Sequence, residues 1–186
     1  MANKDAAFGL KPIGKVGQNA DNGGYSEYDI AASASAIYFN DPVEMLATGT
    51  VGVAAAGDAL LGSLTGVFFT DASTGKPTYA NHLDASNTAT DIKGFVADDP
   101  YGRFEIQSAG TVAQTNIGNC ADIVYAAGGS HDYVSGVEIS GTMAATTAQL
   151  KIIGVSKDPE NDELGSANAN VIVNINEHFL KQTAGI

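Results

Sequence analysis

Apolar and polar residues alternate along several short stretches of this chain. In the stretch YSEYDIAA, Tyr28 and Ile30 fall on one side of an extended backbone, and Glu27 and Asp29 fall on the other. Successive side chains of a β-strand point to opposite faces, so this period of two predicts a strand with one buried face. The last apolar stretch, 170–180, repeats the pattern and predicts a closing strand.

Within that closing strand, Val171, Val173 and Ile175 share one face, while Ile172 and Asn174 share the other. Further short apolar runs are separated by Gly, Pro, Asn and Asp, the residues that favour turns. We therefore expect an all-β fold, a small barrel or a sandwich, with about eight to ten strands and at most one or two short helical turns. The further runs occupy residues 35–46, 50–57, 64–70, 92–98, 103–110, 133–140 and 148–158.

Three stretches of the chain are less regular. Residues 98–102 (DDPYG) predict a hairpin turn between the two strands that flank them. Residues 71–91 are polar with few apolar anchors, and we interpret them as a long loop or an excursion from the sheet. Residues 111–129 are compatible with a short helix or with a loop whose isoleucines point inward.

The N-terminal segment differs from the rest of the chain. Residues 1–22 combine three large apolar side chains with three lysines and are too rich in Gly and Asn for a stable helix. We expect an extended arm that lies against another protein surface, followed by a β-rich domain at 23–186. The candidate contact residues of the arm are Lys4, Phe8, Leu10, Lys11, Ile13 and Lys15.

The charge and cysteine content of the chain limit the classes of partner and the disulfides that we expect. The chain has 9 Lys and Arg against 21 Asp and Glu, a formal net charge of −12. Proteins that bind nucleic acid cluster basic residues against phosphates, so we expect no nucleic-acid partner. Cys120 is the only cysteine, which leaves no partner for an intramolecular disulfide. Because no apolar run approaches the ~20 residues of a membrane-spanning helix, and no secretory signal is recognisable, we expect no membrane partner.

Patterns that indicate catalysis or metal binding are weak in this sequence. His82, His131 and His178 are scattered without metal-ligand spacing, and no nucleophile motif accompanies them. The acidic stretch at 158–165 faintly resembles a calcium loop but lacks its glycine and its last glutamate, so we interpret it as a solvated hairpin. We expect a protein that is not an enzyme and that has no metal and no cofactor.

Three stretches resemble one protein family. In 1–33 a Gly-Leu-Lys-Pro arm leads through an Asn-Gly turn into a Tyr-containing strand; 36–45 contains Asn-Asp-Pro-Val; and 135–180 ends in a long strand followed by Asn-Glu-His. In this pattern the chain is similar to the head decoration proteins, also called capsid cement proteins, of tailed bacteriophages, which are encoded beside the major capsid protein. The likeness covers most of the chain, and 71–91 and 108–131 depart from it most.

The resemblance implies a structural protein on the outer capsid surface of a virion, made in the host cytoplasm. Its implied partners are the major capsid protein and either a homotrimer or neighbouring copies on the shell. The arm is then expected to be mobile in the free protein and ordered on the shell, held by strand pairing with the shell and by its lysines.

The alternative function is a carbohydrate-binding module on a virion surface or tail. Modules of this kind display aromatic rings to their ligands. The loop candidates for such rings are Tyr79, Tyr101, Tyr125 and Tyr133, although the sequence has no Trp and no obvious cluster of aromatic residues.

Overall fold

The computed structural model describes residues 2–17, 24–129, 131–144 and 147–182, and it confirms the predicted all-β fold. Two 3-10 turns, η1 (Gln114–Asn116) and η2 (Phe179–Lys181), are the only helical elements in that part of the chain, and neither is long and apolar enough to cross a membrane. The boundary expected between residues 22 and 23 lies outside the described residues. The strands are β1 Lys11–Lys15, β2 Ser26–Asp29, β3 Pro42–Met45, β4 Val51–Val53, β5 Leu60–Thr70, β6 Pro77–Ala80, β7 Lys93–Ala97, β8 Gly102–Gln107, β9 Cys120–Ala121, β10 Ile123–Val124, β11 Glu138–Ile139, β12 Leu150–Val155 and β13 Asn170–Ile175.

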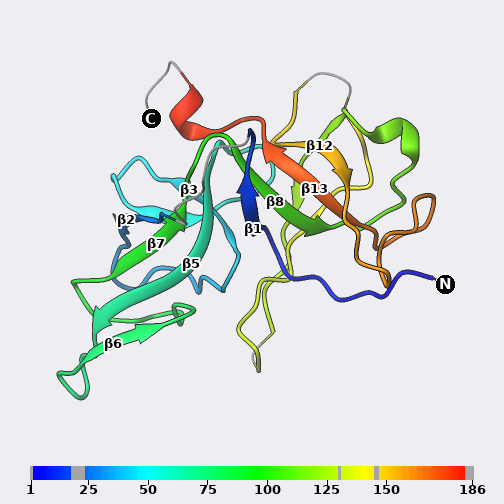
Figure 1. The fold of residues 1–186 in the computed structure, drawn as a ribbon. Coiled ribbons are helices and arrows are strands. Elements are labelled where there is room, and N and C mark those ends of the chain that lie inside the picture. The colour runs from blue at the N-terminus through cyan, green and yellow to red at the C-terminus, as the bar shows by residue number, and fades with distance from the viewer. Residues whose placement is uncertain (1, 18–23, 130, 145–146, 183–186) are drawn as a thin grey trace.

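Two large antiparallel sheets make up most of the molecule (Figure 1). One has five strands in the order β1-β8-β13-β12-β9, and the other has the order β2-β7-β5-β3-β4 with β6 also paired to β5. Strands β10 and β11 form a separate two-stranded sheet. Both large sheets end in edge strands within the described residues, so neither sheet closes into a barrel, and the packed sheets are consistent with a sandwich.

Each large sheet has its own group of buried apolar residues. Strand β5 contributes to both groups, because Leu60 packs in the core of the five-stranded sheet and Leu61 in the core of the other sheet. The alternation predicted for the closing strand is confirmed in β13, where Val171 and Val173 are fully buried and Ile172 is partly exposed. Burial of side chains of this size stabilises the fold by about 1.5–3 kcal/mol each.

The paired hairpin predicted around residues 98–102 is wrong. The turn itself forms, since Gly102 N donates a hydrogen bond to Asp99 O at 2.8 Å. However, β7 pairs with β2 and β5, while β8 pairs with β1 and β13. Both sides of each strand are therefore occupied, and the turn leads the chain from one sheet into the other.

The loop predicted at 71–91 contains a strand. Strand β6 pairs with β5 from Val67↔Ala80 to Thr70↔Pro77. Asp71 stabilises the connection, because its Oδ1 accepts hydrogen bonds from Ser73 N and Thr74 N at 2.8 Å each. At 111–129 the chain combines the single turn η1 with the short strands β9 and β10.

A buried glutamine next to β12 of the five-stranded sheet connects that sheet to the β4–β5 connection of the other large sheet. Gln149 Nε2 donates to Ala55 O at 2.7 Å and to Asp58 O at 2.8 Å, both in the connection between β4 and β5. Its Oε1 accepts from Ile123 N at 3.0 Å. Gln149 is fully buried, and buried polar groups are nearly always hydrogen-bonded. These contacts therefore hold the two large sheets in a fixed position relative to each other.

Candidate interaction surface

The N-terminal segment lies along the body of the protein from its first described residues. Gln107, which is buried in β8, donates from Nε2 to Lys4 O at 2.9 Å and accepts at Oε1 from Ala6 N at 2.8 Å. Asn161 Nδ2 donates to the same Lys4 oxygen at 2.7 Å. Asn3 Nδ2 extends the attachment with a bond to Ala167 O at 2.8 Å. The backbone of this segment is thus paired within the chain.

Leu10 is a core residue. Its side chain has no exposed surface and belongs to the buried cluster beneath the five-stranded sheet. Its N–H donates to Asn40 O at 2.8 Å. The preceding Gly9 adopts φ +74°, and a Cβ at this position would overlap Asn40 O and the Ser135 side chain. A glycine is therefore required for the segment to approach the body this closely.

The structure places residues 2–17 differently from the mobile arm expected from the sequence. Strand β1 pairs with β8, with Pro12 opposite Phe104, and so completes an edge of the five-stranded sheet. The physical reason is that β8 would otherwise expose an unpaired edge and Leu10 would leave a hole in the core. Strand pairing by the arm thus occurs with its own body, and a contact with a capsid stays a prediction.

The other candidate arm residues are distributed over the surface. Lys4 is exposed, while Phe8 is partly buried, with the Lys11 ammonium 5.8 Å from the centre of its ring. Ile13 is 45% exposed, and Lys15 is partly exposed. Lys11 also forms an ion pair with Glu105 at 3.1 Å. Of the six residues, only Lys11 and Ile13 lie on the surface described next.

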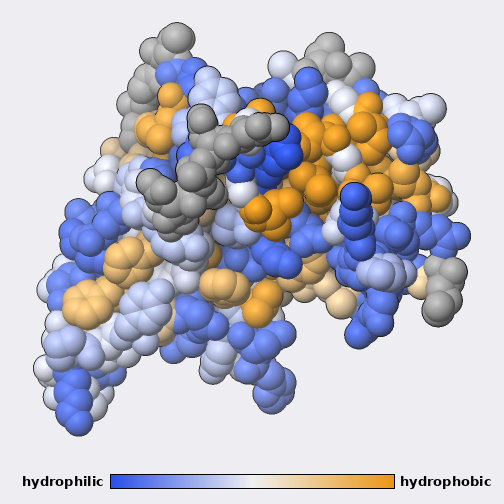
Figure 2. All heavy atoms as spheres, viewed as in Figure 1, coloured by the Kyte–Doolittle hydropathy of each residue, from blue (hydrophilic) through white to orange (hydrophobic). Residues whose placement is uncertain are grey.

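The solvent side of the five-stranded sheet, here called the outer sheet face, carries apolar side chains. Ile13 and Ile172 lie on this side. Ile153 lies there too, because it follows the buried Ile152 in β12, at the point where the register with β13 shifts. Figure 2 shows apolar residues gathered over β1, β12 and β13 on this side of the molecule. We define the outer sheet face by Lys11, Ile13, Arg103, Lys151, Ile153 and Ile172.

The outer sheet face is basic although the protein is acidic. Three of its members are Lys or Arg, out of 9 in the whole chain. Glu105 lies on the same side of the sheet, but it is paired with Lys11 and also accepts a hydrogen bond from the Ser156 hydroxyl. Arg103 and Lys151 are exposed and have no ion pair within the described residues. This side of the sheet is therefore suited to an acidic partner.

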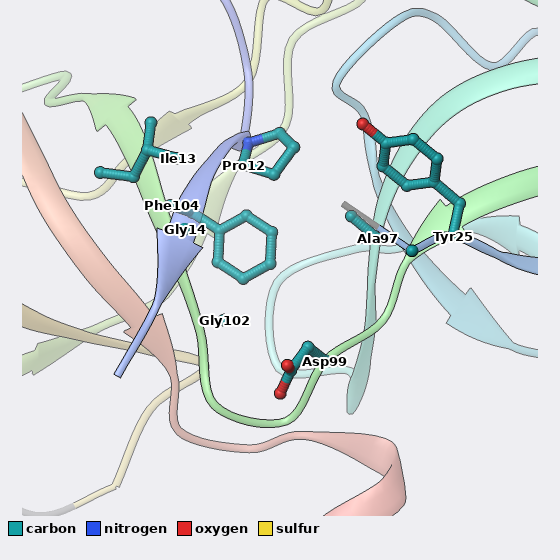
Figure 3. A pocket seen from close by; sticks show the side chains of 9 residues that line it. Pro12, Ile13, Gly14, Tyr25, Ala97, Asp99, Gly102 and Phe104 are labelled. Carbon is teal, nitrogen blue, oxygen red and sulfur yellow. The ribbon is translucent and has the colours of Figure 1, made fainter. Parts of the chain in front are cut away.

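A small pocket lies at the junction of the two large sheets (Figure 3). The ring of Phe104 lies between Pro12 and Asp99, Tyr25 stands on the other side, and Ile13 points away. The pocket has a volume of about 190 Å³. Ligand sites usually have volumes of about 300–1,000 Å³, so we assign no ligand to it.

The histidines do not come together in a catalytic arrangement. The ring of His82 stacks on Tyr133 at 3.7 Å between centres, and its Nε2 lies 3.4 Å from an Asp84 oxygen. His178 is buried, and His131 is exposed in a turn. Within the described ranges, no group of three or more His, Cys, Asp or Glu side chains could hold a metal ion.

Two buried titratable groups have shifted pKa values. Burial raises the pKa of the Asp41 carboxyl to about 6, although its Oδ2 accepts from Tyr38 N at 2.7 Å. Burial also lowers the pKa of His178 to about 4, with a smaller contribution from the positive charge of Lys181. Both side chains have no exposed surface, so we interpret these shifts as a property of the fold and assign no ligand contact to either group.

Sequence reasoning missed most of the outer sheet face. Arg103 of β8 is far along the chain from Lys151 and Ile153 of β12, and only the sheet order brings them together. One signal was available, because Ile172 is an apolar residue on the polar face of the closing strand. An apolar side chain on a solvent-facing strand position indicates a contact surface.

Comparisons with known proteins provide no family assignment. No protein family, curated protein or solved structure matches this chain. The resemblance to capsid cement proteins therefore stays a prediction, and the function has to be argued from the described surfaces.

Proposed function

We propose that the chain is a structural virion protein that binds the outside of a phage icosahedral capsid and stabilises the shell. The observation that carries the proposal is the outer sheet face, where isoleucines lie beside Arg103 and Lys151 on a protein of net charge −12, and neither basic side chain has an ion pair within the described residues. Apolar patches rimmed by polar residues mark protein contacts. The resemblance of 1–33, 36–45 and 135–180 to cement proteins suggests the partner, which is the major capsid protein.

Side chains of the outer sheet face, and not added strand pairing, are proposed to make the contact. Strand β1 is the nearest sheet edge, but Pro12 has no N–H to offer and the register shifts between Pro12 and Gly14. Both features oppose pairing with a further strand. A protein that binds only the assembled shell stabilises it by mass action, by about 2.7 kcal/mol per site at a concentration 100 times the dissociation constant.

The first test replaces an exposed apolar side chain of the outer sheet face. Ile13→Asp is expected to weaken binding to expanded, undecorated phage heads about tenfold or more, because it places a carboxylate in a desolvated apolar contact. Ile13 is 45% exposed, so the free protein should remain folded. Cosedimentation with heads over a range of protein concentrations measures the change.

The matched control for this test is Val124→Asp. Val124 is 44% exposed but lies in β10, away from the outer sheet face. It should leave head binding unchanged. If both variants bind heads as tightly as the wild type, the outer sheet face is not the capsid contact.

The second test concerns charge. Arg103→Glu is expected to weaken head binding and to reduce its dependence on salt, because an exposed basic side chain facing acidic groups is screened by ions beyond ~8 Å at physiological ionic strength. Lys76→Glu is the control, since Lys76 is exposed in the connection between β5 and β6. Equal salt dependence of head binding in the two variants would argue against electrostatic attraction at this face.

The alternative function, a carbohydrate-binding module on a virion surface or tail, predicts a different location and number of copies. A cement protein should cover the shell in many copies, whereas a tail module should be present in few. Electron cryomicroscopy of the intact virion distinguishes the two. The observation that favours a sugar site is a separate groove, which is compatible with a cement function and is considered next.

A further inference from the structure

A second concave site is lined by aromatic rings from distant parts of the chain. The groove has a volume of about 380 Å³, which is within the usual range for ligand sites. Tyr25 and Tyr79 are 53% and 66% exposed, although both line this groove. The complete lining is Lys11, Pro12, Tyr25, Phe39, Asn40, Thr65 and Tyr79.

The ring of Tyr79 is held in a fixed position. It lies across β5 at Gly66, where a Cβ would overlap the Tyr79 hydroxyl oxygen and would lie 2.9 Å from Cζ. Phe95 supports it, with ring centres 5.8 Å apart and an angle of 40° between the planes. An aromatic ring packed on a glycine and a second ring, yet 66% exposed, presents a preformed flat surface to solvent.

The polar groups of the groove are spaced between the rings. Thr65 Oγ1 donates to Phe95 O at 2.9 Å, so its lone pairs remain available to accept a hydrogen bond. Lys11 also lines the groove, although its ammonium is paired with Glu105, and each tyrosine hydroxyl can donate or accept. The lining contains no Val, Leu, Ile or Met, the side chains that usually receive an apolar helix.

We propose that this groove binds a hexose unit of a carbohydrate. A pyranose ring has apolar C–H faces that stack on flat aromatic rings and hydroxyls that both donate and accept at its edge, which matches the alternation of rings and polar groups here. A proline-rich peptide is a poorer match, because it has few donors for the oxygen acceptors of the groove. The site is separate from the outer sheet face in all but Lys11, so its ligand and the capsid are proposed to bind independently.

The test uses the full chain with its tyrosine rings labelled with carbon-13, so that each of the 7 tyrosines gives its own NMR signals. The probes are methyl glycosides of glucose, galactose, mannose and N-acetylglucosamine. At least one is expected to shift the signals of Tyr25 and Tyr79 while leaving Tyr101 unchanged. We expect a dissociation constant on the order of 1 mM, because only a few contacts hold one sugar unit.

Two variants test the fixed ring. Tyr79→Ala should weaken the binding of that glycoside about five- to tenfold. Gly66→Ala should weaken it similarly while leaving Tyr79 in place in the sequence, because the added methyl displaces the ring tip from its seat. Tyr101→Ala is the control, since Tyr101 is 64% exposed but does not line the groove.

Three results of these titrations would contradict the sugar-binding proposal. If no glycoside shifts Tyr25 or Tyr79, or if Tyr101 shifts equally, the proposal is wrong. It is also wrong if a proline-rich peptide shifts the two signals and the sugars do not. Head binding by Tyr79→Ala is measured in parallel and should equal that of the wild type, so that failure of the sugar site and failure of the capsid function can be told apart.

Discussion

Leu10→Ala is expected to lower the free energy of unfolding by about 2–5 kcal/mol. Leu10 has no exposed surface and belongs to the core of the five-stranded sheet, so its removal takes away apolar contacts and leaves a cavity. Domains of this size have total stabilities of about 5–15 kcal/mol, and the loss is therefore a large share. Urea denaturation followed by circular dichroism measures it, through the transition midpoint at unchanged slope.

The control for this prediction is in the same segment. Ile13→Ala removes a side chain that is 45% exposed and should change the stability by no more than about 0.5 kcal/mol. Equal effects of the two substitutions would show that residues 2–17 do not pack on the body in solution. Deletion of residues 2–17 is therefore a poor test of capsid binding, because the truncated protein should lose part of its core and an edge strand.

The strands could be predicted where burial follows a simple alternation. In β13 the residues Val171 and Val173 are buried and Asn174 is partly exposed, as the period of two requires. In β2 the same rule holds, with Tyr28 partly buried between exposed Glu27 and Asp29. Each of these strands has one face toward a core, which is the condition under which pattern alone is informative.

The position of the N-terminal segment could not be predicted from its pattern. Leu10 and Ile13 are similar side chains three residues apart, yet one is fully buried and the other is 45% exposed. The difference arises from Gly9, whose positive φ directs the chain toward Asn40, and from the edge of β8 with which β1 pairs. An extended segment with apolar anchors has the same sequence pattern whether it pairs with its own sheet or with a partner.

The outer sheet face and the aromatic groove also could not be predicted from the sequence, because each is assembled from strands that are separated along the chain. The sequence indicates Tyr79 as a candidate ring for sugar binding but gives no such indication for Tyr25 or Phe39. The groove depends on β6 folding back on β5, which brings Tyr79 to it. The glycine that seats Tyr79 is 13 residues before it in the chain and resembles an ordinary strand glycine. Pairing register, which single-residue patterns do not specify, is the missing information.

The dependence of stability on pH is expected to contain two large and opposite contributions. The pKa of Asp41 rises from 3.8 in the unfolded chain to about 6 in the folded protein. The folded state therefore binds more protons in this interval, and the contribution of Asp41 to stability is lost as pH rises from about 4 to about 6. A pKa difference of this size corresponds to about 3 kcal/mol.

The contribution of His178 to stability changes with pH in the opposite direction. Its pKa falls from 6.5 in the unfolded chain to about 4 in the folded protein, so the unfolded state binds more protons between these values. Its contribution to stability is complete above about pH 6.5 and is lost as pH falls toward 4, again by about 3 kcal/mol. In the wild type the two contributions should largely cancel between pH 4 and 6.

Single substitutions should reveal each contribution. Asp41→Asn keeps an oxygen that can accept from Tyr38 N, and relative to the wild type its stability should rise by about 3 kcal/mol between pH 4 and 6. His178→Asn keeps an acceptor for Leu180 N, and relative to the wild type its stability should fall with pH over about 4 to 6.5 by a similar amount. Urea denaturation at half-unit pH steps gives the three curves. Parallel curves for the wild type and both variants would mean that neither group titrates with a shifted pKa, and the burial of Asp41 and His178 would then need another explanation.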